Sequence, residues 1–469
     1  YVGESPRYWF LVGSAQLPSG QESVPPAVRQ RTVTLTGHPA RDWQGEALTA
    51  WRLNHRRGVI EAVTGTGKTR VGILAAHEAL ERRERVAVIV PTLDLLEQWD
   101  SEIAAALPSV RRARCGGGYA ASLDDCDVLL TTVQSGMRYQ LGSDSHRSLL
   151  IADEVHRYGS EGFSAALEPG FASRMGLTAT LERSDEGVEA TLLPYFGRKV
   201  FTCGFERALA DKILSHFRVG FLPVSFRPDE RRDYVAAEER AKKARGTLIN
   251  AYGCDPYHFG TFMAQVSGMA GGPASDERDV ARKYLSAFSQ RKKLTAESSH
   301  KVEALRHLAP FLAQASRTLV FTETKHGAEI AASVLRAGKL RSESLSSDDD
   351  RTRRKEVLRR FRTGSLQVLA APRILDEGID VPAADVGVIV AATQSRRQMI
   401  QRMGRILRKV DGKDVATLVV MYVEGSMEDP NRDTGETFLD DIRDFADDVE
   451  TVDPIGAQTK FAHWWNGGR

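Results

Sequence analysis

The feature that most constrains this chain is a β-branched run that leads into a glycine-rich loop and then into an amphipathic segment. Residues 58–62 form the strand-like run, residues 63–69 have the sequence VTGTGKT, and an apolar-periodic stretch follows. A strand, a glycine loop and a helix in this order form a cradle for phosphate, because glycines let successive backbone N–H groups approach an anion at a helix N-terminus. The unit predicts an α/β domain with a parallel sheet.

The loop also carries the two side chains that a nucleoside triphosphate requires. Lys68 is expected to meet the β- and γ-phosphate oxygens, and Thr69 is expected to hold Mg²⁺. Ala62 departs from the strict motif, which has its first glycine at this position. A chance glycine turn is the alternative interpretation. The residues of the loop predicted to bind ATP are Thr64, Gly65, Thr66, Gly67, Lys68 and Thr69.

Short β-branched runs alternate with amphipathic stretches in two separate parts of the chain, which is the pattern of βαβ units. The first part predicts an α/β domain over residues 36–204, and the second predicts another over residues 297–425. The elements expected in the first domain are strands at 85–90, 127–132 and 149–152 and helices at 71–82 and 93–106. Those expected in the second lie at 318–322, 329–336, 351–362, 366–371 and 386–391.

The remaining segments have a different composition. Residues 205–296 are rich in charge and helix formers, and they are predicted to form a helical insertion. Residues 426–469 include an acidic stretch and are expected to be a C-terminal tail, which either packs on the protein or binds a partner. The role of residues 1–35 stays open.

Composition sets the broad class without pointing to a function. The 469 residues are 42% hydrophobic and 27% charged, as in a folded globular protein of about two to four domains. Lys and Arg total 64 and Asp and Glu total 62, so a contact with nucleic acid must depend on local basic residues. No apolar run of about 18 residues occurs, so we expect a cytoplasmic protein without membrane contact. The four cysteines lack a C-x-x-C pair, which argues against a zinc site and a disulfide framework; they are Cys115, Cys126, Cys203 and Cys254.

A pair of carboxylates follows the predicted strand at 149–152. Asp153 and Glu154 should therefore lie at the carboxyl end of a buried strand, where open α/β sheets place their ligand sites. Asp153 is suited to binding Mg²⁺, and Glu154 is suited to act as the general base that aligns an attacking water. Helix capping by paired acids is the competing explanation.

A basic run in the second domain supplies the remaining candidates. Residues 401–408 have the sequence QRMGRILR, in which Gln401 comes first and Arg405 and Arg408 lie about one helical turn apart. Both arginines could reach the γ-phosphate across a cleft and stabilise charge in the transition state, although a basic solvated helix is the alternative. Within DEGIDVP, which follows a predicted strand, Gly378 and Asp380 are candidates for contact with the nucleotide, and a plain strand–turn–strand is the competing explanation.

The order of these segments resembles the superfamily 2 helicases and translocases over about residues 40–425. In RDWQ, Gln44 is similar to the glutamine that reads adenine. The segments that match motifs I, II, III and VI are residues 65–69, 153–156, 178–180 and 401–408. The resemblance implies an α/β protein with two tandem RecA-like P-loop domains, parallel sheets and a mainly helical insertion, which uses ATP and Mg²⁺. The residues that it assigns to nucleic-acid contact are Pro91, Thr92, Thr131, Thr132, Arg183 and Thr322.

Within the superfamily, the segments DEVH, LTATLERSDEG, LDEGIDVP and QRMGRILR look most like the XPB group of DNA repair and transcription helicases. That group carries an Arg-Glu-Asp element after motif III, but Ser184 stands in its middle position here, so the element is incomplete. Motif V also departs, with Ala370 and Ala371 where hydroxyl residues often lie. The insertion near 225–295 corresponds to a thumb-like module that grips nucleic acid. The chain resembles a minimal archaeal, bacterial or phage form.

The resemblance implies an ATP-dependent DNA helicase or translocase that acts on single-stranded, duplex or forked DNA in repair, recombination or defence. RNA is the less favoured substrate, and a nuclease or a repair or defence subunit would be the expected protein partner. One alternative is a double-strand translocase of a restriction complex that does not separate strands. Another is a nucleotide-gated clamp that does not hydrolyse ATP. A kinase-type or transporter-type P-loop ATPase would not explain the second domain with its arginines.

Overall fold

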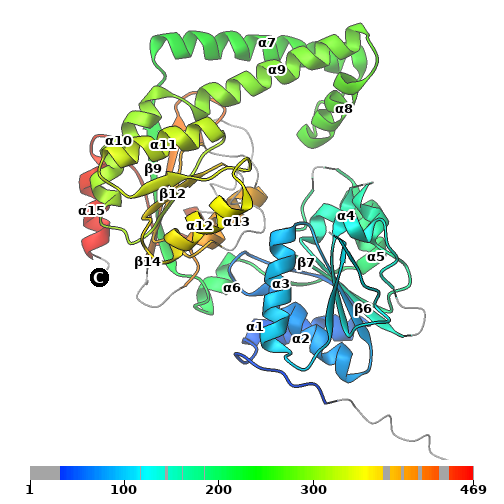
Figure 1. The fold of residues 1–469 in the computed structure, drawn as a ribbon. Coiled ribbons are helices and arrows are strands. Elements are labelled where there is room, and N and C mark those ends of the chain that lie inside the picture. Colours follow the sequence, from blue (N-terminus) through cyan, green and yellow to red (C-terminus); the bar gives the residue numbers. More distant parts are fainter. Residues whose placement is uncertain are drawn as a thin grey trace, which may run out of the picture.

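The computed structural model describes residues 32–467 apart from positions 117, 143–145, 161, 184, 373–380, 392–395, 410–414 and 432–442. In this part of the chain, two α/β lobes lie beside each other, and a helical module extends from the second lobe (Figure 1). Each lobe is built on its own sheet. The expected class, two tandem P-loop-type domains with a helical segment between them, is confirmed.

The first lobe contains an eight-stranded sheet in the order β4-β3-β5-β2-β6-β7-β1-β8, in which only β4 runs antiparallel to its neighbour. Its strands are β1 (Arg57–Ala62), β2 (Arg85–Val90), β3 (Arg112–Gly116), β4 (Tyr119–Ala120), β5 (Val128–Thr132), β6 (Ser148–Asp153), β7 (Ser173–Thr178) and β8 (Lys199–Cys203). Its helices and helical turns are α1 (Asp42–Leu53), α2 (Lys68–Glu81), α3 (Leu93–Ala106), α4 (Val133–Gly136), η1 (Val155–Gly159), η2 (Phe163–Ala166), η3 (Val188–Leu192), α5 (Leu193–Phe196) and α6 (Phe205–Ala210).

Alternate residues of the first sheet face two different cores, because side chains of a strand point in turn to opposite faces. In β2, Val86 and Val88 belong to the core formed with α1, α2 and α3, whereas Ala87 and Ile89 belong to the core formed with η1, η2 and α5. Both faces of the central strands are therefore buried, which explains why these strands are continuous apolar runs. Parallel strands end at the same edge, so the loops after β1, β2, β6 and β7 gather there.

The second lobe contains a seven-stranded parallel sheet in the order β11-β12-β10-β13-β14-β9-β15. Its strands are β9 (His216–Val224), β10 (Thr318–Phe321), β11 (Ser342–Ser344), β12 (Val368–Ala371), β13 (Val386–Ile389), β14 (Val415–Val423) and β15 (Asp448–Thr451). Its helices are α10 (Ser299–Leu312), α11 (Lys325–Ala337), α12 (Arg351–Arg362), α13 (Arg396–Ile406) and α15 (Ala457–Gly467). One apolar cluster runs from the first lobe through Phe205, Ile213 and Leu214 into the second.

Two boundaries differ from those expected from the sequence. The segment predicted as a helical insertion from residue 205 begins with the short helix α6 and then forms β9, which pairs with β14 over nine residues, so the long helices begin only at Pro228. The segment predicted as an acidic tail contributes β15, which pairs with β9, and α15, whose Phe461 packs against Gly220. Pairing with distant strands decides both outcomes, and local composition does not reveal it.

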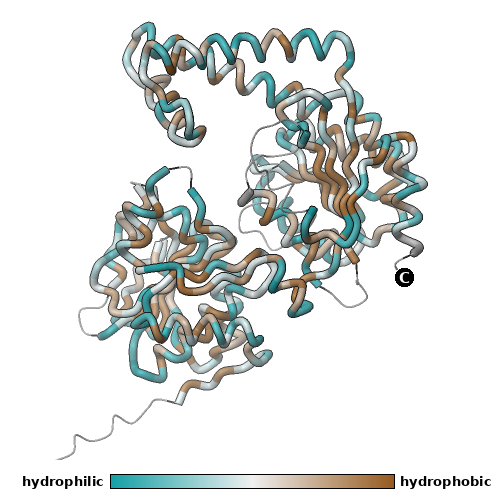
Figure 2. The backbone as a smooth tube through the Cα atoms, turned by 180° about the vertical axis from the view of Figure 1, so that it is seen from behind, coloured by the Kyte–Doolittle hydropathy of each residue, from teal (hydrophilic) through white to brown (hydrophobic). Residues whose placement is uncertain are grey.

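The helical module consists of α7 (Pro228–Tyr252), α8 (Phe259–Gly271) and α9 (Asp276–Ala296). The helices α7 and α9 run side by side away from the second lobe, and α8 turns back from their far end (Figure 1). The module has a small core of its own, which includes Leu248, Phe262 and Tyr284. Figure 2 shows that hydrophilic residues recur along this module, in contrast to the apolar strands inside the two lobes. We therefore treat it as a separate arm.

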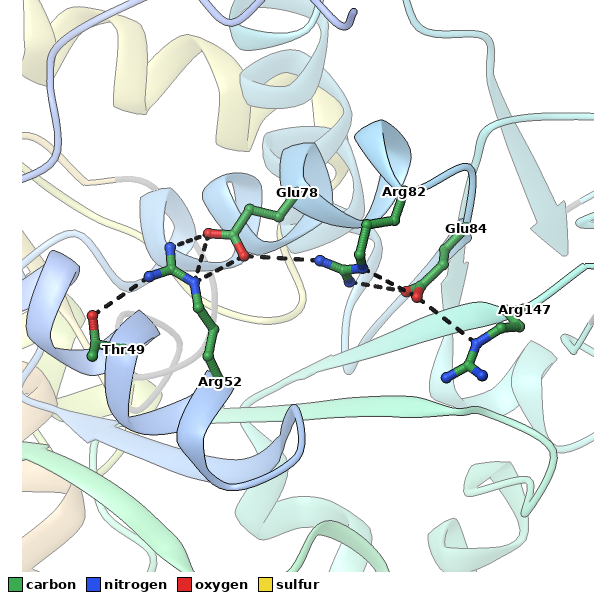
Figure 3. A network of polar contacts seen from close by, with 6 residues as sticks. All are labelled: Thr49, Arg52, Glu78, Arg82, Glu84 and Arg147. Carbon is green, nitrogen blue, oxygen red and sulfur yellow. Dashed lines mark hydrogen bonds and ion pairs between the residues drawn. The ribbon is translucent and has the colours of Figure 1, made fainter. Parts of the chain in front are cut away.

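A chain of ion pairs joins α1, the end of α2 and the residues that precede β2 and β6 in the first lobe (Figure 3). Arg52 of α1 donates to both carboxylate oxygens of Glu78 of α2 at 3.1 Å, and Arg82 donates to Glu84 at 3.0 Å. Arg147 lies 4.0 Å from Glu84. Exposed pairs of this kind contribute only about 0–1 kcal/mol each, so the cores hold these helices in place.

The described residues contain no helix that is both long and apolar enough to cross a bilayer. All four cysteines are buried free thiols.

Candidate nucleotide site between the lobes

The phosphate loop connects the end of β1 to the start of α2. Gly65 and Gly67 have φ angles of 93° and 95°, a left-handed backbone that favours glycine, and the hydroxyl of Thr66 donates to the Val63 carbonyl at 2.7 Å. The Lys68 ammonium donates to the Ala62 carbonyl at 2.7 Å, which holds it over the loop. The geometry is that of an anion cradle at a helix N-terminus.

Gln44 lies against this loop, as its predicted role in adenine binding requires. Its amide nitrogen donates to the Gly67 carbonyl at 3.1 Å, and its amide oxygen accepts from the backbone N–H of Arg41 at 2.9 Å. The Arg41 guanidinium in turn donates to the Thr66 carbonyl at 2.9 Å. Sequence analysis did not assign a role to Arg41, although its place in RDWQ, three residues before Gln44, was the available signal.

Asp153 lies at the end of β6 with both carboxylate oxygens engaged. Oδ2 accepts from the indole N–H of Trp99 at 2.8 Å, and Oδ1 accepts from the backbone N–H of Glu154 at 2.9 Å. Burial raises the pKa of the Asp153 carboxyl, and the hydrogen bond from Trp99 together with the charge of Lys68 opposes that rise. Trp99 was not among the predicted site residues, because nothing local in the sequence links it to Asp153.

Motifs II and III are connected by a buried hydrogen bond. The His156 Nδ1 atom lies 3.0 Å from the hydroxyl of Thr178, and that hydroxyl donates to the Thr180 carbonyl at 2.6 Å. The ends of β6 and β7 are therefore joined through side chains beside the phosphate loop. A movement of one strand end can therefore be passed to the other through this buried hydrogen bond.

The second lobe reaches the phosphate loop through α13. A Cβ atom placed on Gly404 would lie 2.4 Å from both the Cβ and the carbonyl oxygen of Thr64, and one placed on Gly65 would lie 2.8 Å from the Gly404 carbonyl oxygen. Glycine is therefore required on both sides of this contact. Just beyond it, the Leu407 carbonyl accepts from the Ser215 N–H at 2.7 Å.

A cavity of about 1060 Å³ lies between the lobes beside this contact. Burial lowers the pKa of Lys68 in its wall, the charges of Glu154 and Asp153 raise it, and the charge of Arg408 adds to the lowering. Arg408 of the second lobe thus lines the same cavity as Lys68. The predicted site residues that line the cavity are Thr64, Gly65, Gly67, Lys68, Thr69, Asp153, Glu154, Gln401, Arg405 and Arg408.

Ion pairs between α3 and α12 lie along another wall of the same cavity. Arg351 and Lys355 both contact the Glu97 carboxylate, Lys355 at 3.7 Å, and Arg354 lies 3.4 Å from the Asp94 carboxylate. The two helices were predicted from the sequence, but their contact was not. The available signal was the density of arginine in residues 351–362.

Five of the residues predicted to contact nucleic acid lie at the end of β5 or directly after β2 and β10, but most of their side chains point inward. The Thr131 hydroxyl donates to the Cys115 carbonyl at 3.0 Å, and the Thr322 hydroxyl donates to the Thr324 carbonyl at 3.0 Å. Pro91 and Thr132 are also buried, and Thr92 is half-buried at the N-terminus of α3. Any contact that these loops make with a nucleic-acid strand would therefore use mainly the backbone groups of the loops.

The Arg183 side chain is engaged in hydrogen bonds within the first lobe. Its guanidinium donates to both carboxylate oxygens of Asp185 at 2.6 and 2.5 Å and to the His156 carbonyl, and its side chain is 13% exposed. Ser184, Gly378 and Asp380 lie outside the described residues.

The protein has two lobes, each built on a largely parallel sheet. The phosphate loop of one lobe and the arginines of the other line the same cavity, which defines a two-lobed P-loop protein. Residues 37–183 match the family described as "Type III restriction enzyme, res subunit", and residues 300–410 match "Helicase conserved C-terminal domain". A "DNA 3'-5' translocase XPB2" from Sulfurisphaera tokodaii is 31% identical over 395 residues, 82% of each chain. A "DNA 3'-5' helicase XPB" from Mycobacterium tuberculosis is 25% identical over 76% of this chain and 56% of that relative.

Solved structures share the fold. The Pyrococcus furiosus Hef helicase domain has a TM-score of 0.53 at 16% identity, covering 83% of this chain and 96% of its own. The Type ISP restriction-modification enzyme LlaBIII bound to DNA has a TM-score of 0.56 at 16% identity, covering 92% of this chain and 32% of its own. The chain belongs to the superfamily 2 helicases, and within them it is of the XPB-like type. It is an ATP-dependent enzyme.

Proposed function

We propose that this protein hydrolyses ATP at the cavity between its lobes and uses the cycle to move along or remodel DNA. The observation that carries the proposal is that Lys68 of the first lobe and Arg405 and Arg408 of the second line one cavity. A triphosphate bound to the loop around Lys68 would then face Arg405 and Arg408, which belong to the second lobe. Turnover would thereby depend on how the lobes are arranged.

The residues at the phosphate loop are suited to Mg²⁺. Thr69 and Asp153 line the same cavity and offer a hydroxyl and a carboxylate, the hard oxygen donors that this ion prefers. In the proposed site these two residues hold the ion, which would neutralise charge on the phosphates. Glu154 orients the attacking water, and Lys68, Arg405 and Arg408 stabilise charge that develops on the transferred phosphoryl group.

DNA is the proposed substrate because the two XPB-type relatives are named as a DNA translocase and a DNA helicase. The loops after β2, β5 and β10 would contact the phosphate backbone. Such contacts carry little sequence information, so we expect binding that is nearly independent of sequence and weakens with salt. Repair, recombination or defence are the proposed settings, with a nuclease or a repair or defence subunit as a partner.

The decisive experiment measures ATP turnover alone and with single-stranded, duplex and forked DNA, and with the matching RNAs. Stimulation by DNA well above stimulation by RNA supports the proposal, and equal rates with and without nucleic acid refute it. Lys68→Ala must abolish the stimulated rate.

A double-strand translocase that does not separate strands is the second candidate. Its support is the match of residues 37–183 to a restriction-enzyme subunit family. Unwinding of a forked duplex favours the helicase, whereas displacement of a triplex strand without unwinding favours the translocase. Tight ATP binding without turnover would instead support a nucleotide-gated clamp.

A further inference from the structure

The helix α3 brings three kinds of contact together within eight residues. The hydroxyl of Thr92 caps its N-terminus by accepting from the Leu95 N–H at 3.3 Å. Asp94 and Glu97 form the ion pairs with the second lobe, and Trp99 donates to Asp153. A helix is stiff over two turns, so a shift imposed at its N-terminus or by the second lobe also moves Trp99.

Trp99 is buried and closely packed against α2. It is 1% exposed, and its ring contacts the backbone of α2 so closely that a Cβ on Gly72 would lie 2.5 Å from it. The same Cβ would lie 3.2 Å from Leu177, one residue before motif III. The ring is thus wedged between the helix that follows the phosphate loop and the strand that leads to Thr178, so its N–H has a defined direction.

We propose that Trp99 is a positioning residue, whose indole N–H fixes the orientation of the Asp153 carboxylate and makes that orientation depend on α3. With one oxygen held by Trp99 and the other by the Glu154 N–H, the carboxylate cannot rotate freely. Partners that orient a metal-binding carboxylate typically change metal affinity by about 10–100-fold when they are removed. The inference rests on the proposed function, since it assumes that Asp153 holds Mg²⁺.

The test replaces Trp99 by Phe, which keeps an aromatic ring but removes the donor. The matched control is Trp51→Phe, because the Trp51 indole also donates a buried hydrogen bond, at 2.9 Å to the Arg174 carbonyl, at a place remote from the nucleotide. Binding of a fluorescent ATP analogue is measured in EDTA and at a series of Mg²⁺ concentrations. Thermal unfolding is recorded for all three proteins.

We expect Trp99→Phe to bind the analogue normally in EDTA but to need about 10-fold more Mg²⁺ for the gain in affinity that the ion gives. Trp51→Phe should keep the Mg²⁺ dependence of the wild type. If Trp99→Phe also keeps the wild-type Mg²⁺ dependence, or if both variants lose this dependence equally, Trp99 has no specific role. If the wild type itself shows no Mg²⁺-dependent gain, the proposed function fails, and not only the inference.

A second substitution covers the case in which Trp99→Phe does not fold. Incorporation of β-(3-benzothienyl)alanine at position 99 keeps the bicyclic shape and replaces the N–H by sulfur. The same loss of Mg²⁺ dependence is expected, together with a fall in the fold-stimulation of ATP turnover by DNA. Wild-type values in both measurements would overturn the proposal.

Discussion

Glu154 has a backbone conformation that few residues other than glycine adopt. Its φ and ψ angles are 50° and 49°, in the left-handed region, and such a conformation costs on the order of 1–3 kcal/mol. The conformation lies between the end of β6 and the turn η1, both of which are well packed. Strain of this kind persists at functional sites when the surroundings determine it, which agrees with the role proposed for Glu154.

Replacement of Glu154 by Gln should lower DNA-stimulated turnover by about 10²–10⁴-fold, because an amide cannot take up a proton from the attacking water. Nucleotide affinity should stay near the wild-type value. Steady-state ATP hydrolysis and equilibrium binding of an ATP analogue measure the two effects. Glu189→Gln, at an exposed position of the same lobe, serves as the control. Unchanged turnover in Glu154→Gln would contradict the assignment.

Replacement of Gly404 by Ala should uncouple the lobes, because its Cβ would overlap the backbone of Thr64. We expect a loss of DNA-stimulated turnover of at least about 10-fold, while each lobe stays folded. Gly246→Ala is the control, since a Cβ there meets nothing within 4 Å. ATP turnover of both variants measures the loss of activity, and circular dichroism checks that the lobes stay folded. A fully active Gly404→Ala would show that this contact is not used in the cycle.

At this scale the sequence predicts those site residues that belong to continuous motifs. Spacing alone was sufficient to select Lys68, Asp153 and Arg408, and all three line one cavity. It could not select Trp99 or Glu97, because their partners lie in segments that only folding brings near. The inward direction of the Arg183 side chain could not be predicted from the sequence either, since it depends on a hydrogen bond to the His156 carbonyl.

Among the described elements, α3 and α12 are joined by ion pairs that connect one lobe to the other. Exposed ion pairs contribute about 0–1 kcal/mol each and are screened by salt. Their importance therefore lies in setting the position of one lobe against the other more than in overall stability. Because salt screens these ion pairs, a change in salt concentration can weaken the contact between the lobes while the apolar cores stay intact.

Glu97→Arg should separate the lobes, because it would place a third cation beside Arg351 and Lys355. We expect lower energy transfer between a fluorophore pair, one on each lobe, and an effect that fades at high salt, because a screening length of about 8 Å at physiological ionic strength falls to about 3 Å at 1 M. The double variant Arg351→Glu/Glu97→Arg should restore much of the transfer. Glu46→Arg, in a pair within the first lobe, is the control. No change in Glu97→Arg would contradict the proposed role of this contact.

A buried ion pair anchors the region where the arm joins the second lobe. The Lys301 ammonium of α10 contacts the Glu428 carboxylate in the turn after β14, and both side chains are buried. Burial lowers the pKa of Lys301 and raises that of Glu428, while their mutual attraction opposes both changes. Each charge is thus tolerated because of the other.

Lys301→Met should lower the free energy of unfolding by about 3–5 kcal/mol, since it leaves an uncompensated carboxylate in the interior. The double variant Lys301→Met/Glu428→Leu should recover most of that loss. Denaturant unfolding measures both. Arg359→Met, which removes one side of an exposed pair in α12, is expected to have no measurable effect. A single variant as stable as the wild type would mean that Glu428 finds another partner or becomes protonated at no cost.

The elements show which parts of the fold a sequence can reveal. The expected ranges 85–90, 93–106 and 351–362 coincide with β2, α3 and α12 because their hydrophobic period and caps are local. The strand β9 was missed within a segment that looked helical. Its burial depends on β14, which follows about 200 residues later, so no local window contains the signal.

For the whole molecule, the outer part of the arm carries an excess of basic residues that the total charge conceals. The chain carries a formal charge of only +2, yet residues 240–293 contain 10 Lys and Arg against 4 Asp and Glu, whereas residues 228–239 at the start of the arm contain 2 against 5. Because β9 precedes the arm and α10 follows it, the arm can be removed without interrupting the second sheet. Such a deletion offers a test of what the arm contributes.

Replacement of residues 232–294 by a short flexible linker should reduce the salt dependence of DNA binding. For every phosphate group that the shortened protein no longer neutralises, the slope of log K against log salt should become shallower by about 0.9 for duplex DNA. ATP turnover without DNA should persist. Binding titrations between low and moderate salt measure the slope. An unchanged slope would show that the arm does not touch the phosphate backbone.

The pairing of β9 with β14 has a consequence for how the protein is made. The first lobe can close as soon as β8 has left the ribosome, but β9 then waits for about 200 residues before β14 can lie beside it. At about 5–20 residues per second, that interval is roughly 10–40 s, during which an apolar strand has no edge to join. Newly synthesised chains should therefore depend on chaperones during this interval, and a ribosome stalled just before residue 415 should carry a finished first lobe and an unfinished second one.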